Sequence, residues 1–264
     1  MPSSPVPSSS VPSPAAAADV PAVPSGPLLV LVAMPEEAAP LLERLSGRRA
    51  LETPFTEGVT AERGMLAGTE TLVVTTGIGI AAATAAATWA ILSSSPSLVV
   101  AAGSCGGLGA DVEVGTLIVG ETFTYSIADA TAFGYAPGQV PGGPERFSAQ
   151  PTWVKAAEQA ARRTAAQSPD GPGTRRGLML SGDAFVTAEI AAPMRERFPS
   201  ALSADMETTA SARTAEALGV PFAALRAVSD LCGPAAGQQF HLELDVVAEI
   251  SARAVEELAG SLTD

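Results

Sequence analysis

Short apolar runs alternate along this chain with longer segments of helical composition, and this alternation limits the possible folds more than any other feature. The runs at 28–34 (LLVLVAM) and 97–103 (SLVVAAG) are continuous, as is typical of strands buried on both faces. Strands are also predicted at 71–77, 115–127, 175–182, 200–206 and 221–230, and helices at 35–45, 80–92, 152–167, 187–197, 207–218 and 244–261. Because strands separated by helices form parallel βαβ units, we predict an α/β fold, a three-layer α/β/α sandwich.

The first 26 residues do not share this pattern. Residues 1–26 are rich in Pro, Ser and Ala and contain no aromatic residue, so we predict a disordered or polyproline-like tail. The tail has neither a basic start nor a continuous apolar stretch, which makes it a poor match to a signal peptide. The rest of the chain, 27–264, is predicted to form one domain, because 47% apolar residues suffice for a single large core.

Composition excludes several classes of partner. The chain has 28 Asp and Glu residues against 15 Lys and Arg, a formal net charge of −13. Phosphate backbones and anionic lipids repel such a protein, so we expect neither a nucleic-acid partner nor a membrane. No apolar run reaches the roughly 18 residues of a membrane span. Two cysteines do not make a disulfide framework and suggest reduced thiols in a cytoplasmic protein.

Carboxylates follow three of the predicted strands. Glu37, Glu207 and Asp230 each stand just beyond, or at, the carboxyl end of a strand. Any one of them could simply favour the start of a helix. In parallel sheets, however, ligands bind beyond the carboxyl ends of the strands. The convergence of three acids on one edge therefore predicts a functional site there.

Other motifs carry less chemistry. The GIGIAA stretch at 77–82 matches a dinucleotide-binding pattern, but the next strand does not end in the acid that would bind ribose. The Gly-rich stretch at 101–109 either makes a tight turn or lets a ligand approach the backbone. Cys105 within it would need a base to act as a nucleophile, and the only histidine is His241, in a predicted loop. Two Cys and one His far apart match no zinc site, so no metal is predicted.

The chemistry is therefore assigned to carboxylates. Paired acids and no metal signature favour acid–base work on a bond with a cationic transition state, and cleavage of a glycosidic bond fits this description. Composition and spacing do not name the substrate.

A family resemblance narrows the choice. In order along 28–262, the chain contains AMPEE, GIGIAAA, GSCGGL, DATAFGYAPGQVPG, LSGDAFV, DMETTA and RAVSD. With these motifs it resembles the 5′-methylthioadenosine/S-adenosylhomocysteine nucleosidases of the purine nucleoside phosphorylase superfamily. The resemblance implies a central mixed, twisted sheet, as in nucleoside phosphorylases, no cofactor, and hydrolysis of 5′-thio-substituted adenosines to adenine and the thioribose.

The resemblance also implies catalytic roles. Glu37 corresponds to the base that activates the attacking water, and Asp230 to the acid that protonates N7 of the purine. Glu207 corresponds to the carboxylate that grips the ribose hydroxyls, and Arg226 lies near the water and the ribose. Asp230 must then hold a proton near neutral pH, which requires burial or a neighbouring anion. In this interpretation Asp205 only starts the helix.

Further residues are expected to bind the substrate. Phe185 corresponds to the ring that stacks on adenine, and Val186 to the backbone group that hydrogen-bonds its edge. Met206 accompanies Glu207 at the sugar. The remaining members of the expected site are Met34, Ser104 and Ser229.

A long loop is expected to act in a dimer. Residues 129–145 include Phe133, Tyr135 and Pro141, which resemble residues that cross a dimer interface and cover the 5′-thio group in the partner's site. A loop of this length without secondary structure is more often functional than idle, although the aromatic residues could also form a local cluster. We therefore expect a homodimer with composite sites.

Departures from the family pattern bear on the substrate. Phosphorylases hold phosphate with an arginine where this chain has Ala101, which favours water as the nucleophile. The predicted loop 231–243 is longer than usual, Leu244 stands where an aromatic residue often lines the 5′ pocket, and Ser126 and Ile127 replace polar, acidic neighbours. The preferred 5′ substituent thus stays open. The alternatives are a nucleosidase for 6-amino-6-deoxyfutalosine or 5′-deoxyadenosine, and a non-catalytic nucleoside-binding protein.

Overall fold

The computed structural model describes residues 25–167 and 173–263. Almost all of the predicted tail, residues 1–26, lies outside the described residues. Only Ser25 and Gly26 of it are described, and both are exposed. Within the described part, no helix is long and apolar enough to cross a membrane.

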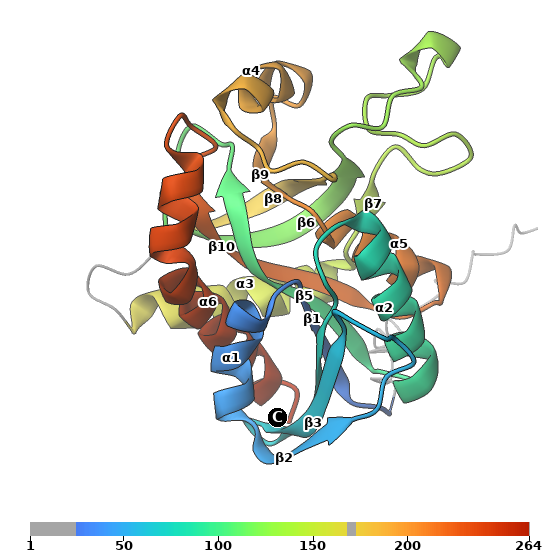
Figure 1. Ribbon diagram of the computed structural model, residues 1–264, viewed down its shortest axis with the longest axis vertical. Coiled ribbons are helices and arrows are strands. Elements are labelled where there is room, and N and C mark those ends of the chain that lie inside the picture. Colours follow the sequence, from blue (N-terminus) through green and yellow to red (C-terminus); the bar gives the residue numbers. More distant parts are fainter. Residues whose placement is uncertain (1–24, 168–172, 264) are drawn as a thin grey trace, which may run out of the picture.

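One mixed sheet of ten strands organises the described residues (Figure 1). Its strands are β1 (Leu28–Val32), β2 (Ser46–Leu51), β3 (Thr60–Leu66), β4 (Thr69–Thr75), β5 (Leu98–Gly107), β6 (Leu117–Tyr125), β7 (Phe147–Ser148), β8 (Thr174–Ser181), β9 (Ala201–Asp205) and β10 (Phe222–Asp230). Strand β1 lies between β4 and β5 and is parallel to both. The β2–β3–β4 edge is antiparallel, as are the pairings β10–β6 and β5–β9. The mixed sheet implied by the family resemblance is confirmed.

Part of this sheet closes on itself. Strand β10 pairs with β5 on one side and with β6 on the other, and β6 continues through β8 and β9 back to β5. The five strands therefore form a ring, from which β1, β4, β3 and β2 extend as an open sheet. Closure gives the ring strands partners on both sides, so none of them is a free sheet edge.

Helices cover the sheet on both sides, which confirms the predicted three-layer α/β/α arrangement. Helices α1 (Pro35–Arg44), α3 (Pro151–Ala166) and α6 (Ala236–Gly260) pack together on one side, and α2 (Ile80–Ser94) and α5 (Thr208–Ala217) pack together on the other (Figure 1). Helix α4 (Ala188–Arg197) covers a smaller apolar cluster over β8 and β9. A short 3₁₀ helix, η1 (Thr131–Phe133), lies in the long loop between β6 and β7.

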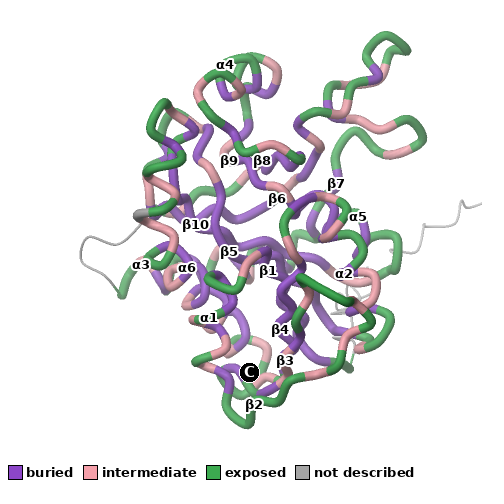
Figure 2. Tube along the Cα trace, in the orientation of Figure 1, coloured by how far each residue is buried: buried purple, intermediate pink, exposed green. Residues whose placement is uncertain are grey.

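The core follows the sheet (Figure 2). All five residues of β1 and all nine of β10 are buried. Alanines on the inner faces of α2 and α6, such as Ala86 and Ala254, are fully buried. Small side chains let these helices approach the sheet closely, while the buried Leu and Val side chains each contribute about 1.5–3 kcal/mol by leaving water.

Several elements differ from the sequence predictions. Strands β2, β3 and β7 were not predicted, and β2 gives no apolar signal because five of its six residues are exposed. Strand β5 continues to Gly107, so the stretch interpreted as a turn or ligand loop is a strand paired with β9. Helix α6 starts at Ala236 rather than at 244. The predicted loop 231–243, with His241, is therefore mostly helix, which its Gly- and Gln-rich sequence did not indicate.

Candidate active site

The predicted carboxylates meet at one cavity. Its volume is about 270 Å³, the scale of a small-molecule site, and it lies where β1, β5, β9 and β10 end. Ten of the thirteen predicted site residues line it: Met34, Glu37, Ser104, Phe185, Val186, Met206, Glu207, Arg226, Ser229 and Asp230. Strands β1, β5 and β10 are parallel and bring their carboxyl ends to one edge, which is why residues almost 200 positions apart in the chain reach the same space. Strand β9 runs antiparallel to β5, and its carboxyl end reaches this space because the ring of strands is closed.

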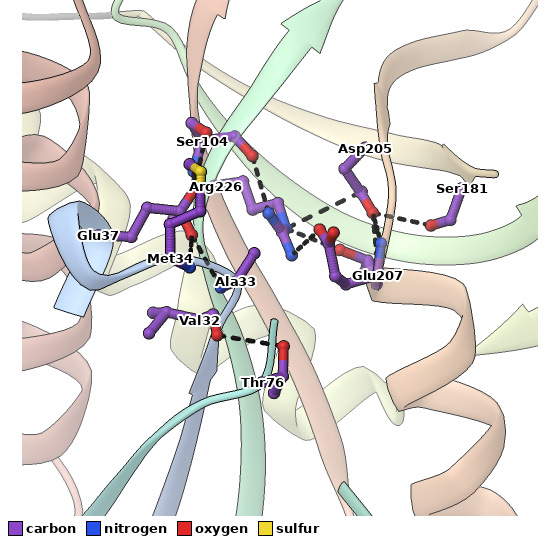
Figure 3. Close-up of polar contacts among 12 residues, drawn as sticks. Val32, Ala33, Met34, Glu37, Thr76, Ser104, Ser181, Asp205, Glu207 and Arg226 are labelled. Carbon is purple, nitrogen blue, oxygen red and sulfur yellow. Dashed lines mark hydrogen bonds and ion pairs between the residues drawn. The ribbon is translucent and has the colours of Figure 1, made fainter. Parts of the chain in front are cut away.

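Four hydrogen bonds hold the carboxylate of Glu37. One carboxylate oxygen accepts hydrogen bonds from the backbone N–H groups of Ala33 (2.8 Å) and Met34 (3.3 Å), and the other accepts from the backbone N–H and the hydroxyl of Ser104, both at 2.7 Å (Figure 3). The side chain is buried on α1 just after β1. Gly103 makes this possible: a Cβ there would lie 2.5–2.6 Å from the carboxylate atoms of Glu37. The four donors fix the orientation of the carboxylate.

Arg226 in β10 and Glu207, just after β9, form a buried ion pair. The guanidinium Nη2 lies 3.3 Å from Oε2 of Glu207, Nη1 donates to the Ser104 carbonyl at 2.8 Å, and Nε donates to the Thr208 hydroxyl at 2.7 Å (Figure 3). Burial alone would lower the pKa of Arg226, but the charges of Asp205 and Glu207 raise it. Arg226 therefore stays charged and supports anions at this side of the cavity.

Asp205 lies beside this pair and has a structural task. Asp205 Oδ1 accepts from the backbone N–H groups of Glu207 (2.8 Å) and Thr208 (2.7 Å) and from the Ser181 hydroxyl (2.9 Å). It thus fastens the start of α5, in agreement with the structural role predicted for Asp205. Burial raises the pKa of Glu207 to about 7, and the charge of Asp205 adds to this rise while Arg226 opposes it.

The GIGIAA turn also serves the site. The backbone N–H of Gly79 donates to Glu207 Oε1 at 2.9 Å, and that of Ile80 donates to Asp183 at 2.7 Å. Two carboxylates from distant segments thus accept from N–H groups at the start of α2 that have no partner within the helix, at the end where the helix dipole favours negative charge. The structure gives this motif the task of orienting Glu207.

Asp230 lies in a largely buried position at the end of β10. It is the last residue of β10, and its carboxylate accepts hydrogen bonds from the Ser229 hydroxyl (3.0 Å) and the backbone N–H of Cys232 (2.9 Å). Burial raises the pKa of Asp230 above its usual range, and these hydrogen bonds only partly oppose the rise. The expected direction of this pKa is therefore confirmed, with burial as its cause.

The rest of the cavity is apolar. Phe185 and Val186 come from the segment between β8 and α4, and Met206 from the turn between β9 and α5. The Phe185 ring meets the ring of Phe240 edge-on, with the centroids 5.7 Å apart. Ile78, which is 56% exposed, stands at the cavity as well. Such a surface suits a flat heteroaromatic ring.

The first turns of α6 contribute an aromatic residue to the cavity. Phe240 lines the cavity and Leu244 does not, so the aromatic side chain stands four residues before the position at which the family resemblance led us to look for one. His241 likewise does not line the cavity, and the Cys105–His241 pair does not form around it. Burial raises the pKa of the Cys105 thiol, which keeps it unreactive.

The loop 129–145 stands apart from the cavity of its own chain. Phe133, Tyr135 and Pro141 are not among the lining residues. In Figure 1 the loop projects away from the sheet beyond β7. Phe133 is 84% exposed, the most of any large apolar residue in the described part of the chain. Within one chain, then, these three residues do not join the other ten.

The side chains around the cavity also bear on whether a metal ion or a phosphate could bind there. Among the described residues, no group of His, Cys, Asp and Glu side chains could hold a metal ion. Arg226 is the one basic residue among those lining the cavity, and three of its nitrogens are already engaged. Ala101, which replaces the phosphate-binding arginine of phosphorylases, is buried in β5.

Fold and site together define an α/β protein with a small-molecule cavity built on buried carboxylates at the carboxyl ends of the strands of a mixed sheet. The Phosphorylase superfamily model matches residues 27–263. Among solved structures, the 5′-methylthioadenosine/S-adenosylhomocysteine nucleosidase of Neisseria meningitidis, in complex with methylthio-immucillin-A, is 35% identical, with a TM-score of 0.83 over 89% of this chain and 99% of that one.

Two further structures agree. The corresponding nucleosidase of Colwellia psychrerythraea, in complex with adenine, is 31% identical, with a TM-score of 0.81 over 90% of this chain and 96% of that one. The S-adenosylhomocysteine nucleosidase of Streptococcus pyogenes, in complex with 5-methylthiotubericidin, is 26% identical, with a TM-score of 0.82 over 91% and 99%. This chain belongs to the Phosphorylase superfamily and, within it, to the 5′-methylthioadenosine/S-adenosylhomocysteine nucleosidases.

Proposed function

We propose that this protein hydrolyses the N-glycosidic bond of 5′-methylthioadenosine and S-adenosylhomocysteine, releasing adenine and the thioribose. One observation carries the proposal: Glu37, Asp230 and the Glu207–Arg226 pair line the same cavity, beside an apolar wall. The reaction needs a leaving-group acid, a base for water and an anion near the cationic sugar. The cavity supplies a carboxyl group for each task. The span of the family match, 27–263, also supports one domain over residues 27–264.

Asp230 is the leaving-group acid in this mechanism. Adenine is a poor leaving group as an anion, and protonation at N7 lets it depart neutral. An acid whose pKa is raised by burial carries that proton closer to neutral pH than an exposed aspartate does. The Ser229 hydroxyl holds the second carboxylate oxygen and limits its rotation.

Glu37 activates the water in this mechanism. Its carboxylate already accepts a hydrogen bond from the Ser104 hydroxyl. This hydroxyl can rotate away, so that an incoming water donates to the Glu37 oxygen in its place. Glu207 then accepts from the ribose hydroxyls in its ionised form, which the charge of Arg226 favours, and Met206 packs against the sugar. The two anions together stabilise positive charge that develops on the ribose ring.

Recognition of the base follows from the apolar wall. Phe185 offers a ring face to adenine, and the backbone of Val186 offers polar groups to its edge. Water is the proposed nucleophile rather than phosphate, because the engaged Arg226 is the one basic residue lining the described cavity. A phosphorylase needs a free cation to bind its anionic substrate.

A substrate panel tests the proposal. The purified protein is incubated with 5′-methylthioadenosine, S-adenosylhomocysteine, 5′-deoxyadenosine and 6-amino-6-deoxyfutalosine, with and without phosphate, and free adenine is quantified. We expect fastest release from the two thio compounds, with no effect of phosphate. Preference for either of the other two would reassign the 5′ substituent. Binding without any release would leave a nucleoside-binding protein.

We further propose a homodimer, in a cytoplasmic protein, in which loop 129–145 completes the partner's site. Phe133 projects from this loop with 84% of its surface exposed. Helix α2 has no charged residue in fifteen, and Leu92 on it is 66% exposed. These features suit burial against a second copy. Both cysteines are free and buried, which suits a reducing compartment.

Complementation between subunits tests the composite site. A subunit with Asp230→Asn keeps an intact loop, and a subunit with Tyr135→Ala keeps an intact cavity. Each homodimer should be slow, whereas co-expressed, doubly tagged heterodimers should regain up to about half of the wild-type rate per site, because one of their two sites is complete. Light scattering gives the mass. A fully active monomer, or a Tyr135→Ala homodimer with the wild-type rate, would rule out the shared site.

A further inference from the structure

Arg195 is tied to the site although it does not line the cavity. It lies in the last turn of α4, and its guanidinium donates three hydrogen bonds to backbone carbonyls outside that helix. Nε donates to Leu108 at 3.0 Å, and Nη2 donates to Gly107 at 3.3 Å and to Leu231 at 3.1 Å. The first two carbonyls belong to the end of β5 and the residue after it, and the third follows Asp230 directly. One side chain therefore fastens the segment after Asp230 to the neighbouring strand.

A single peptide group links this guanidinium to the carboxylate of Asp230. The carbonyl of Leu231 and the N–H of Cys232 are the two ends of one planar peptide. The carbonyl accepts from Arg195 at 3.1 Å, and the N–H donates to Asp230 Oδ1 at 2.9 Å. A cation at the carbonyl polarises the peptide and strengthens its N–H as a donor. The orientation of this peptide therefore sets the orientation of the carboxylate.

The peptide does not hold this orientation by itself. Cys232 has φ +52°, in the left-handed region, which costs a residue other than glycine roughly 1–2 kcal/mol. Its thiol fits only because Gly106 has no side chain: a Cβ there would lie 2.5 Å from Cys232 Sγ. The next residue, Gly233, has nothing near its Cβ position. Arg195 supplies a side-chain contact that opposes relaxation of this strained turn.

We propose that Arg195 is a positioning residue for the leaving-group acid, acting through the Leu231–Cys232 peptide. Helix α4 then serves both halves of the reaction, since Phe185 and Val186, proposed to bind the base, lie just before it and Arg195 lies in its last turn. The helix would thus set the purine and the carboxyl group of Asp230 at a fixed separation. This inference rests on the proposed function, because it assigns Asp230 the protonation of the purine.

A double-mutant cycle tests the proposal. Arg195→Met keeps the length of the side chain and removes its donors, and adenine release from 5′-methylthioadenosine is measured in the wild-type and Asp230→Asn backgrounds. In the wild-type background we expect kcat to fall about 10–100-fold, with KM within about threefold. In the Asp230→Asn background the same change should cost less than about threefold, because the group it positions is already disabled.

Controls separate positioning from stability. Arg163→Met removes an exposed arginine that similarly bonds a distant segment, through the carboxylate and the carbonyl of Glu257, and it should leave kcat unchanged in both backgrounds. Arg195→Lys keeps one donor for Leu231 and should show a smaller loss that also disappears with Asp230→Asn. This variant decides the question if Arg195→Met does not fold.

The outcomes are distinct. An equal loss from Arg195→Met in both backgrounds, or no loss in either, would overturn the positioning role while leaving the proposed function intact. If the folded wild-type protein releases no adenine, the proposed function itself fails. A loss confined to the background with Asp230 intact supports the inference.

Discussion

Gly103→Ala should disable the protein through the carboxylate of Glu37. Gly103 has φ +111°, and a Cβ there would lie 2.5–2.6 Å from the carboxylate carbon and both oxygens of Glu37. The carboxylate must withdraw by about 1 Å to reach ordinary van der Waals distance. That movement breaks or lengthens its two 2.7 Å hydrogen bonds with Ser104.

The magnitude follows from these contacts. A hydrogen bond to a charged group contributes about 1.5–3 kcal/mol, and a side chain in a glycine-only region of backbone space costs about 1–3 kcal/mol. Allowing for partial relaxation, we expect Gly103→Ala to lower the free energy of unfolding by about 3–5 kcal/mol. A base displaced by about 1 Å should lower kcat by 10²-fold or more.

The assay pairs urea unfolding with adenine release, and Gly219→Ala is the matched control. Gly219 also has a positive φ, +69°, but nothing lies within 4 Å of its Cβ position. It should therefore lose only about 1–2 kcal/mol from the backbone, with an unchanged rate. The reasoning is refuted if Gly103→Ala keeps its rate within threefold and unfolds like the control.

Two further predictions concern the walls of the cavity. Because burial raises the pKa of Glu207 from 4.5 to about 7, the folded protein binds a proton that the unfolded chain has lost in this window. The free energy of unfolding should then fall as pH rises from 4.5 to 7, by at most about 1.4 kcal/mol per pH unit. In urea titrations Glu207→Gln should flatten this slope. Equal slopes for the wild type and the variant would contradict the prediction. Phe240→Ala removes apolar contact with the substrate, so it should raise KM for 5′-methylthioadenosine about tenfold with little change in kcat. The control His241→Ala removes an exposed neighbour and should match the wild type in steady-state kinetics.

The convergence of the carboxylates was predictable from the sequence. Glu37 follows an apolar run typical of a buried strand and Asp230 ends another, and these parallel strands end at a common edge. The same prediction held for Glu207 for a different reason, because β9 runs antiparallel to β5 and its end reaches the site through the closed ring of strands. The tight turn predicted at Gly77 and Gly79 is present, with φ +78° and +103° at these two glycines. Its role in holding Glu207 required the structure, because that contact joins residues 128 positions apart.

The closed ring of strands could not be predicted in this way. It depends on Gly106 and Gly107, which pair with β9. Glycine has low strand propensity, so the same letters indicate a turn. Phe240 was missed for a similar reason: it lies in a Gly- and Gln-rich stretch without the 3.6-residue period that marks a buried helix face. In both places tertiary packing overrides the local signal.

The most direct test of the central claim is the fate of the water oxygen. The enzyme is incubated with 5′-methylthioadenosine in H₂¹⁸O containing millimolar phosphate, and the sugar product is analysed by mass spectrometry. If Glu37 activates water while Asp230 protonates the purine, the thioribose carries one ¹⁸O atom and adenine appears in equal amount. A phosphorylated thioribose, or intact substrate after long incubation with folded protein, would contradict the account.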